Sequence, residues 1–592
     1  MNQPNWTRFL PVLLPLILLA IATLAAYANA WPNVLVHDDR FFAGSTRFSS
    51  WLDFSRFFTE DLWAATGVRS GLYRPMLLIS LFVDSRLYGD WMAGHHLSNI
   101  FLHMLVSFTV FGFVRHLLRM SNGQSSSADL YAFLAALVFC VHPVHAEVVN
   151  SIFNRSGLLV ALGGTAGLWW FLRYLDTRTF RAWAGLAVAY LFTIFSKESA
   201  VVLPGLAVSL VLIFTPGDWR GRLQKCIPAL WLLIPLTLYL VLRAQALALP
   251  VSMDTSGVRE HTEIETLINI SSFLDWQMIL NTAGVWGVAL KVLVWPWPLK
   301  LYHEDPSVIF QWCALLLHLA LVTVAFFEYR KKRFGLLTGL VFFYIAMLPA
   351  SRFVGLLGES PHMAERYLYF PSVGLVISLA FGLRYLGCRF STKMAMAPVI
   401  LALLVLTPIS LARNAEWANE IGLFESEYRK GSRDGDTLRL LTGARLQEKN
   451  ISRVVEICDL HAEEQKKHGR YSAHCAIAYS HLGRNEEAER AFLFATAKKK
   501  SNTQAHANLA LFYLRLDRRD EAREHYELAV ETELDPALRA YRKGELLVML
   551  HRNDRAKLIE AKAYFEEALR LQPHLALARL RLERLNKTLG LP

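Results

Sequence analysis

The sequence predicts an all-α protein in which a polytopic bundle of membrane helices is followed by an α-solenoid of short helical repeats. Three observations support this prediction. Of the 592 residues, 54% are hydrophobic and the mean hydropathy is +0.28, which is too apolar for a soluble enzyme of this size. Runs of about 20 apolar residues, the length that spans a bilayer, recur through the first part of the chain. From about Arg413 onward the composition becomes charged and Ala-rich, with a repeating pattern.

Residues 1–415 are therefore assigned to the membrane part and residues 416–592 to the repeat part. We predict eleven spans. They centre near residues 10–29, 95–114, 129–143, 157–174, 182–196, 200–215, 226–243, 309–328, 335–350, 367–386 and 394–412. Two further stretches stay open. Residues 75–89 are too few to cross, and residues 278–298 are interrupted by Lys291, so either stretch can be an interfacial or re-entrant helix.

The loops between the predicted spans alternate in charge. The first apolar run has no cleavage site followed by a soluble mature chain, so it is expected to remain as a span. Basic residues gather in every second loop, for example in the run Arg330-Lys331-Lys332-Arg333. The positive-inside rule places these loops in the cytoplasm. An odd number of spans then leaves the first long loop and the repeat part on the outer side.

Charge and cysteine content exclude some classes of protein. The net charge of +12 could indicate a nucleic-acid partner, but basic loops on one face of a membrane protein explain it better, so no nucleic acid is expected. The six cysteines show no CxxC or metal-ligand spacing. Four of them lie in or beside apolar segments and are expected to pack there: Cys140, Cys226, Cys313 and Cys388.

Two adjacent carboxylates, Asp38 and Asp39, follow the first predicted span almost at once. A carboxylate pair at the mouth of a membrane protein can act as a general base, bind a cation or simply be solvated. Other outer loops also carry charges of both signs at the ends of apolar runs, where charge is costly unless it is paired or used. The pattern favours a site for a phosphate-bearing lipid, in which Arg and Lys hold the phosphate and a carboxylate moves a proton.

Six motifs follow one another along the membrane part. They read Leu35-Val36-His37-Asp38-Asp39, Tyr73-Arg74-Pro75, Gly94-His95-His96, His142-Pro143-Val144-His145-Ala146-Glu147, Lys197-Glu198 and Ala364-Glu365-Arg366-Tyr367. In order and spacing they resemble the transmembrane and tetratricopeptide-repeat O-mannosyltransferases and their bacterial relatives, within the C-type superfamily of glycosyltransferases that use lipid-linked sugars. The resemblance implies a polyprenyl-phosphate sugar donor, inversion at the anomeric carbon, and an acidic catalytic motif in the first outer loop, residues 30–94. Its bacterial members make a bacterial inner-membrane protein the expectation, and the charge pattern of the loops then gives a cytoplasmic N-terminus and periplasmic repeats.

The resemblance assigns roles to individual residues. Asp38 or Asp39 would be the base that takes the proton from an acceptor hydroxyl, and Asp38 is preferred because it lies nearer the span end. Candidates to hold the lipid phosphate are Arg74, Arg155, Lys197 and Arg366. Supporting roles are expected for His37, Tyr73, His96, His142, His145, Glu147, Glu198 and Glu365. In one departure, the family often has an Arg-Ala-Asp-like run where this chain reads Asn154-Arg155-Ser156-Gly157, so that acid is missing.

Structural alternatives remain open for several of these residues. Arg74 can extend to lipid headgroups, and Lys197 can pair with Glu198 at a span end. The histidines can be buried and hydrogen-bonded rather than metal ligands, because Pro143 breaks the helix that would align them. The metal requirement is therefore unknown. A divalent cation stays open, and no other cofactor is indicated.

The repeat part shows a clear period. Ala476, Tyr479, Leu482, Ala488, Phe492 and Ala495 recur 34 residues later as Ala510, Tyr513, Leu516, Ala522, Tyr526 and Ala529. This is the tetratricopeptide period. A third unit contains Ala561, Phe565 and Ala568, after an insertion near residues 553–558, and a degenerate unit is expected near residues 437–469. Such stacks commonly bind an extended peptide on the concave side. The alternative is a structural cap over the outer loops.

These observations favour a membrane glycosyltransferase that moves a sugar from a polyprenyl-phosphate donor to a hydroxyl, with protein Ser or Thr as the expected acceptor. Its expected partners are that donor, membrane lipid, and an acceptor protein or peptide bound by the repeats. One alternative is a membrane-anchored repeat scaffold for protein–protein interaction, which would need only one or two spans. Another is a lipid-linked sugar flippase, which would need polar groups at mid-membrane depth.

Overall fold

The computed structural model describes residues 10–41, 51–63, 71–122, 126–248, 275–351, 363–497, 503–533, 535–572 and 575–590. Within these ranges every regular element is a helix, and the one extended pairing is an isolated antiparallel bridge between His303 and Met363. The predicted all-α class is thus confirmed for the described residues. Contacts divide the chain into two units, the first ending at Leu423 and the second beginning at Phe424.

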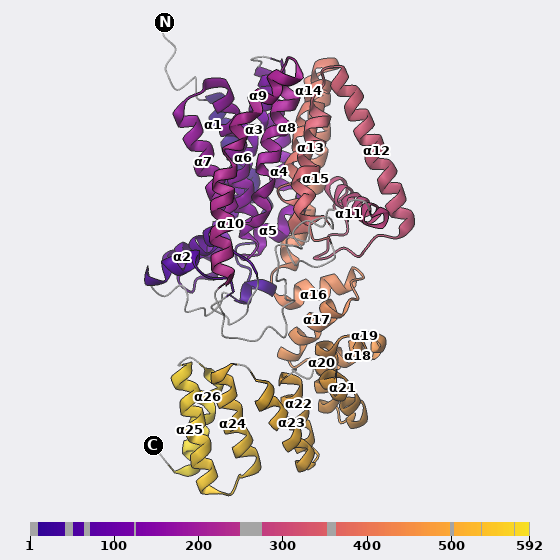
Figure 1. The fold of residues 1–592 in the computed structure, drawn as a ribbon. Coiled ribbons are helices and arrows are strands. Elements are labelled where there is room, and N and C mark those ends of the chain that lie inside the picture. Colours follow the sequence, from indigo (N-terminus) through magenta and orange to yellow (C-terminus); the bar gives the residue numbers. More distant parts are fainter. Residues whose placement is uncertain are drawn as a thin grey trace. The chain divides into compact units, whose positions relative to one another are not determined.

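The first unit is a bundle of long apolar helices (Figure 1). Its α-helices are α1 (Leu10–Ala26), α2 (Pro75–Tyr88), α3 (Met92–Asn122), α4 (Ser126–Val141), α5 (Ala146–Asn150), α6 (Arg155–Thr177), α7 (Phe180–Ile194), α8 (Leu203–Phe214), α9 (Trp219–Leu230), α10 (Leu233–Ala248), α11 (Trp276–Val294), α12 (Val308–Arg330), α13 (Gly335–Met347), α14 (Ser372–Arg389) and α15 (Thr392–Glu416). In the described ranges, six short 3₁₀ helices connect them: η2 (His37–Phe41), η4 (Trp51–Phe58), η6 (Pro143–His145), η7 (Glu198–Val202), η10 (Leu348–Ala350) and η11 (Glu365–Leu368).

The prediction of eleven spans is confirmed only in part. Among the described residues, seven helices are long and apolar enough to cross a membrane, or eight if α4 and the bent segment after it form one span. The predicted spans at residues 10–29, 182–196, 200–215 and 335–350 correspond to apolar helices of only 10–17 residues. Of the two open stretches, α11 is a candidate span, whereas α2 is not and lies across the direction of the long helices (Figure 1).

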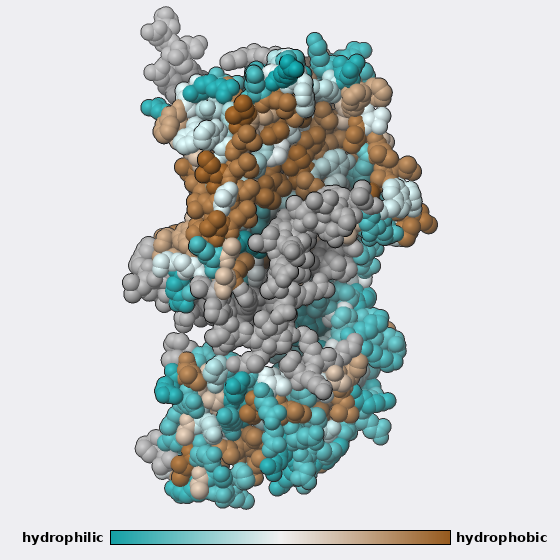
Figure 2. Space-filling view, viewed as in Figure 1, coloured by the Kyte–Doolittle hydropathy of each residue, from teal (hydrophilic) through white to brown (hydrophobic). Residues whose placement is uncertain are grey.

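Side chains on these helices produce the surface expected of a membrane protein. Figure 2 shows brown, hydrophobic residues over the helices of the first unit, whereas teal, hydrophilic residues dominate the second. Small residues bring the helices close together inside the bundle. A Cβ atom on Gly339 of α13 would meet the carbonyl oxygen of Gly374 on α14, so only glycine allows this backbone approach. Gly339 and Gly374, at this crossing, both line the apolar cavity described below.

The second unit is a stack of antiparallel helix pairs. It contains α16 (Glu420–Arg429), which begins in the first unit, then α17 (Gly435–Gln447), α18 (Ile451–Leu460), α19 (Ala462–Gln465), α20 (Gly469–His481), α21 (Asn485–Ala497), α22 (Thr503–Arg515), α23 (Arg519–Thr532), α24 (Pro536–Leu550), α25 (Arg555–Leu571) and α26 (Ala576–Leu589). The repeating small and aromatic residues are buried where helices of a pair meet, as Ala522 and Tyr526 are on α23. The solenoid predicted from the 34-residue period is therefore present.

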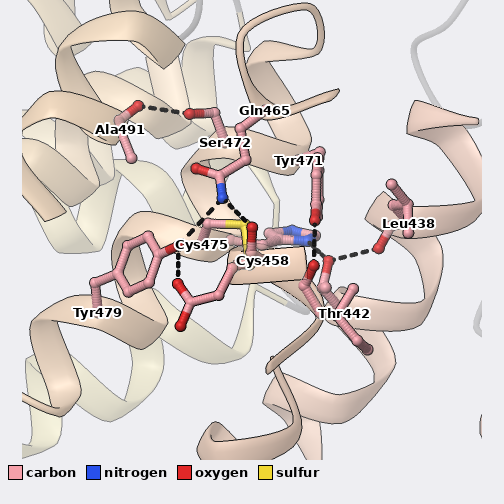
Figure 3. The surroundings of a disulfide bond; sticks show 12 residues. Leu438, Thr442, Cys458, Gln465, Tyr471, Ser472, Cys475, Tyr479 and Ala491 are labelled. Carbon is pink, nitrogen blue, oxygen red and sulfur yellow. Dashed lines mark hydrogen bonds between the residues drawn. A yellow bond between two sulfur atoms is a disulfide. The ribbon is translucent and has the colours of Figure 1, made fainter. Parts of the chain in front are cut away.

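A disulfide joins two helices near the start of this stack. Cys458 on α18 is bonded to Cys475 on α20, as Figure 3 shows. The side-chain amide of Gln465 donates to the Cys458 carbonyl at 2.7 Å, which fixes the intervening turn beside the bond. The sequence spacing gave no indication of this pairing. Since disulfides persist mainly in oxidising compartments, it bears on the side of the membrane where the repeats fold.

Candidate active site

Asp39 is buried and fully bonded within the fold. It lies on η2, and its side chain is 0% exposed. The hydroxyl of Ser151 and the backbone N–H groups of Ile152 and Phe153 donate to its carboxylate, at 2.9, 3.0 and 2.8 Å. Burial raises the pKa of Asp39 to about 6, and the three donors limit the rise. Asp39 thus fastens η2 to the segment that follows α5.

Asp38 has a different environment. Its side chain is 29% exposed, and its Oδ1 lies 3.2 Å from Nδ1 of His37. Burial alone would raise the pKa of Asp38, but the positive charge of His37, followed by those of Arg366 and Arg74, holds the pKa below its ordinary value. His37 begins η2 with φ of 54°, a left-handed conformation that residues other than glycine rarely adopt. Such strain often occurs at functional sites.

Arg366, on η11, is held by contacts on several sides. Its backbone N–H and Nη1 donate to the two carboxylate oxygens of Glu147, both at 2.9 Å. Its Nη2 donates to the hydroxyl of Tyr302 at 3.2 Å. The guanidinium also lies over the rings of Tyr302 and Tyr367, 5.0 and 5.1 Å from their centroids. Glu147 is 1% exposed, so this pair fixes a planar cation at a defined place.

Arg366 and Lys197 line the same cavity. The other residues around it come from the start of α6, from η7, from the end of α13 and η10, and from η11 and the segment between it and α14. They are Gly157, Val160, Ser199, Ala346, Pro349, Ala350, Tyr367, Tyr369, Phe370 and Pro371. Nζ of Lys197 lies 5.7 Å from the centroid of the Tyr367 ring. Two of the four predicted phosphate-binding cations therefore line the same cavity. The charge of Arg366 also lowers the pKa of Asp38.

Arg74 forms a buried ion pair near this site. Its Nε donates to Glu198 at 3.0 Å and its Nη2 donates to the other oxygen at 2.5 Å. The residues are 4% and 9% exposed. Beside them, the Tyr73 hydroxyl donates to the Phe58 carbonyl at 2.9 Å. Arg74 thus braces the start of α2 against η7, and its charge still acts on Asp38.

Arg155 is placed otherwise. It begins α6, but its guanidinium points to α2 and α3 and donates to Asp84 at 2.5 Å and to Asn99 at 2.6 Å. Further bonds go to the carbonyls of Ser80 and His95, and the side chain is 1% exposed. Arg155 therefore does not line the cavity that holds Arg366. The acid that Arg155 contacts is Asp84 on α2.

The predicted histidines lie in the interior of the bundle. The ring of His142 accepts from the Val144 N–H at 3.2 Å, and its Nε2 bonds the Leu293 carbonyl at 2.9 Å. Nε2 of His145 lies 3.0 Å from the Ser372 hydroxyl. His96 is 1% exposed on α3. In the described ranges, no group of three or more His, Cys, Asp or Glu side chains has the arrangement of a metal site.

Glu365 joins three segments just behind the site. It is 0% exposed, accepts from the backbone N–H of Lys300, and lies 3.3 Å from Nε2 of His303. Nη2 of Arg413, at the end of α15, lies 3.5 Å from its other oxygen. Glu365 thus supports the segment that carries Arg366 rather than facing the cavity.

Several residues around the site were not predicted. They are Tyr302, Tyr367, His303 and Arg413, together with a chain of amides formed by Asn33, Asn150 and Asn414. The Asn33 amide donates to Asn150 at 2.8 Å, and Asn150 donates to Asn414 at 2.8 Å. The concentration of charged and aromatic residues in the run 300–305 was the one available signal for Tyr302 and His303.

A second, mostly apolar cavity lies between α11, α12, α13 and α14. Its lining includes Leu290, Lys291, Phe310, Leu317, Leu340, Phe343 and Leu375. On α13 it is lined by Gly339 and Phe343, and the same face of the helix continues to Ala346 and Ala350 in the charged cavity. The two cavities are therefore lined by successive turns of one helix, with the charges at its end.

The apolar helices, the charged cavity near Asp38 and the helical repeats together define a multi-helix membrane protein with a C-terminal tetratricopeptide-repeat unit. A family model described as "Tetratricopeptide repeat" matches residues 503–536. The chain is also similar to proteins called protein O-mannosyl-transferases, which confirms the resemblance seen in the sequence.

Three comparisons give the extent of that similarity. The mouse protein O-mannosyl-transferase TMTC4 is 27% identical over 418 residues, which cover 62% of this chain and 55% of that protein. Human TMTC3 is 22% identical over 538 residues, covering 83% and 57%. The chain thus spans about half the length of the curated relatives it matches. Among solved structures, yeast Tom70 matches with a TM-score of 0.25 and 12% identity over 78% of this chain and 85% of that one, which is too low to indicate a shared fold.

Proposed function

We propose that this protein is a membrane glycosyltransferase that transfers a sugar from a polyprenyl-phosphate donor to a hydroxyl group of a protein. The observation that carries the proposal is that Arg366 and Lys197 line one cavity, and that the charge of Arg366 also lowers the pKa of Asp38. This arrangement suits an anionic phosphate beside a carboxylate base. The names of the similar proteins make mannose the first sugar to test.

In the proposed reaction, Asp38 accepts the proton of a Ser or Thr hydroxyl while the hydroxyl oxygen attacks the anomeric carbon of the sugar. The bond between that carbon and the phosphate oxygen breaks on the opposite face, so the configuration inverts. The polyprenyl phosphate leaves with an additional negative charge, which Arg366 and Lys197 stabilise. The low pKa of Asp38 keeps it ionised, and therefore able to accept a proton, at neutral pH. The proton passes to water when the product leaves.

Asp39 has a positioning role in this proposal. Three donors already occupy its carboxylate, so it fixes η2 while its neighbour faces the reactants. Arg74 and Glu198 add a buried pair that keeps α2 and η7 together. Arg155 is proposed to hold α2, α3 and α6 rather than the phosphate, because its donors are bonded inside the fold.

The apolar cavity supports the lipid part of the proposal. A polyprenyl chain needs hydrocarbon contact along the bilayer, and the lining of this cavity continues on α13 from the charged cavity. The phosphate would then lie at the charged end and the chain along α13 and α14. Purified protein incubated with radiolabelled polyprenyl-phosphate sugars should transfer one label to protein. If no label moved under any condition that preserves the fold, the enzyme proposal would be abandoned in favour of a repeat scaffold.

The repeats are proposed to lie on the outer side of the membrane and to hold the acceptor. The disulfide supports this side, since it forms readily in the periplasm and not in the cytoplasm. A reporter fused after Trp417 should be active only outside the cytoplasm, and a fusion at Lys331 should behave oppositely. A chain ended after Arg429 should keep donor binding but lose most transfer to protein. Loss of donor binding as well would instead indicate that the repeats brace the membrane part.

A further inference from the structure

The hydroxyl of Tyr302 bonds the guanidinium of Arg366 from outside the segment that carries this arginine. It lies between α11 and α12, and its oxygen accepts from Nη2 of Arg366 at 3.2 Å. Its ring also lies beneath the guanidinium, 5.0 Å from centroid to Cζ. Among the described residues, the hydroxyl has this one partner and no acceptor for its own proton. The O–H donor therefore remains available to a ligand.

The residues on both sides of Tyr302 fix its position relative to Arg366. The backbone N–H of Lys300 and the ring of His303 both bond Glu365, the residue next to Arg366. The backbone N–H of His303 donates to the Met363 carbonyl at 2.8 Å, in the one antiparallel bridge of the described structure. Two short segments are thus joined at three points around the Tyr302–Arg366 contact. The backbone around Tyr302 and Arg366 therefore holds the two side chains in contact.

Tyr302 is also close enough to Asp38 to respond to its charge. Burial raises the pKa of the Tyr302 phenol, the charge of Arg366 opposes the rise, and the charge of Asp38 adds to it. The phenol therefore stays protonated at neutral pH and can donate a hydrogen bond. The charges of the proposed base, Asp38, and of the proposed phosphate-binding cation, Arg366, therefore both act on Tyr302.

We propose that Tyr302 is a further residue that binds the lipid-linked sugar donor. Its hydroxyl accepts a hydrogen bond from Arg366 and donates a hydrogen bond to an oxygen of the lipid phosphate. The inference rests on the proposed function, because it assumes that Arg366 faces a phosphate. A hydroxyl that accepts a hydrogen bond from a cation becomes a stronger hydrogen-bond donor, since the two bonds polarise each other. Tyr302 and Arg366 would then bind the phosphate as a unit, and neither would be fully effective alone.

The test measures binding of undecaprenyl phosphate and of undecaprenol, which lacks the phosphate, to the full-length protein in detergent. Tyr302→Phe removes only the hydroxyl. It should raise the Kd for undecaprenyl phosphate about 10-fold, the effect of losing one hydrogen bond to a charged group, and leave the Kd for undecaprenol unchanged. Tyr344→Phe is the matched control, because it removes a phenol hydroxyl bonded to His318 elsewhere in the bundle. It should change neither Kd.

A double-mutant cycle with Arg366→Lys separates the possible outcomes. If the pair acts as a unit, Tyr302→Phe has little further effect once Arg366 is lysine. Equal weakening of both lipids by Tyr302→Phe would indicate a purely structural role and overturn the inference. If Tyr302→Phe left the Kd for undecaprenyl phosphate unchanged while Arg366→Lys raised it, the role of Tyr302 would be overturned and that of Arg366 would stand. An unchanged Kd in Arg366→Lys would overturn the phosphate site itself, and this inference with it.

Discussion

Arg155 is the first residue of α6 and Arg366 the second residue of η11, and both contact a buried carboxylate, yet they have different surroundings. The Arg155 guanidinium is enclosed by Asp84, Asn99 and two carbonyls, and it is 1% exposed. The Arg366 guanidinium is bound by Glu147 on one side and by tyrosines on others, and it lines a cavity. An arginine whose donors all meet fixed acceptors stabilises the fold, whereas one that faces a cavity and aromatic rings can bind a ligand.

The largest expected effect is the loss of the folded protein on changing Arg155 to Ala. This change would leave Asp84 as a buried charge without its guanidinium, which typically costs about 3–5 kcal/mol. The expected result is a strongly lowered Tm and a small yield of folded protein. Thermal unfolding in detergent measures this. A normal Tm combined with weakened binding of a polyprenyl phosphate would instead place Arg155 in the donor site and remove the contrast with Arg366.

The second prediction concerns Asp39 and pH. Its pKa is raised from an ordinary value near 4 to about 6 in the folded state. A raised folded pKa gives a stabilising contribution that is complete below about pH 4 and is lost as the pH rises to about 6. The stability of the parent relative to Asp39→Asn should therefore fall by about 2–3 kcal/mol across this range. A difference that stays constant between pH 4 and 7 would show that Asp39 is not the buried acid described.

The third prediction concerns Arg366→Lys. Lysine keeps the positive charge beside Glu147 but loses the planar pair of donors. The Kd for a polyprenyl phosphate should rise about 10-fold, as expected for one lost charge-assisted bond, while the Tm changes little. Parallel unfolding and binding measurements on one preparation check this. A large loss of stability with unchanged binding would make Arg366 a second structural arginine, like Arg155.

The smallest effect is expected for Lys197→Met, which keeps an unbranched side chain of nearly the same length and removes the charge. Lys197 lines the cavity with Arg366 but contributes a point charge without bidentate geometry. The Kd for a polyprenyl phosphate should rise about 5-fold. Raising the salt concentration should reduce the difference from the parent, since screening weakens such interactions. Identical binding by variant and parent would restore the interpretation of Lys197 as part of an ion pair at a helix end.

Much of the fold could be predicted because it depends on local patterns. Apolar runs and a 34-residue period directly reflect membrane burial and repeat stacking, and both predictions hold in the described residues. The number of spans could not be predicted as well. Helices such as α7 and α8 are apolar, but each is shorter than a full span, and hydropathy alone does not give the length of a helix.

The candidate site was predictable as a set of residues but not as a set of roles. Sequence position placed Asp38, Lys197 and Arg366 at helix ends, and the structure brings them near one cavity. It could not show that Asp84 on α2 pairs with Arg155, because 71 residues separate them. Tyr302 was missed for the same reason, since its contact with Arg366 depends on a bridge between segments 60 residues apart. The disulfide likewise depends on the packing of α18 against α20.

The proposed chemistry depends most on the difference between Asp38 and Asp39. Asn has nearly the same size as Asp and keeps a polar contact, but it cannot accept the proton. Asp38→Asn should therefore lower sugar transfer at least about 10²-fold while undecaprenyl phosphate binding and Tm remain those of the parent. Such a result would support Asp38 as the general base. Full transfer activity in Asp38→Asn, measured on protein with normal donor binding, would contradict the central claim.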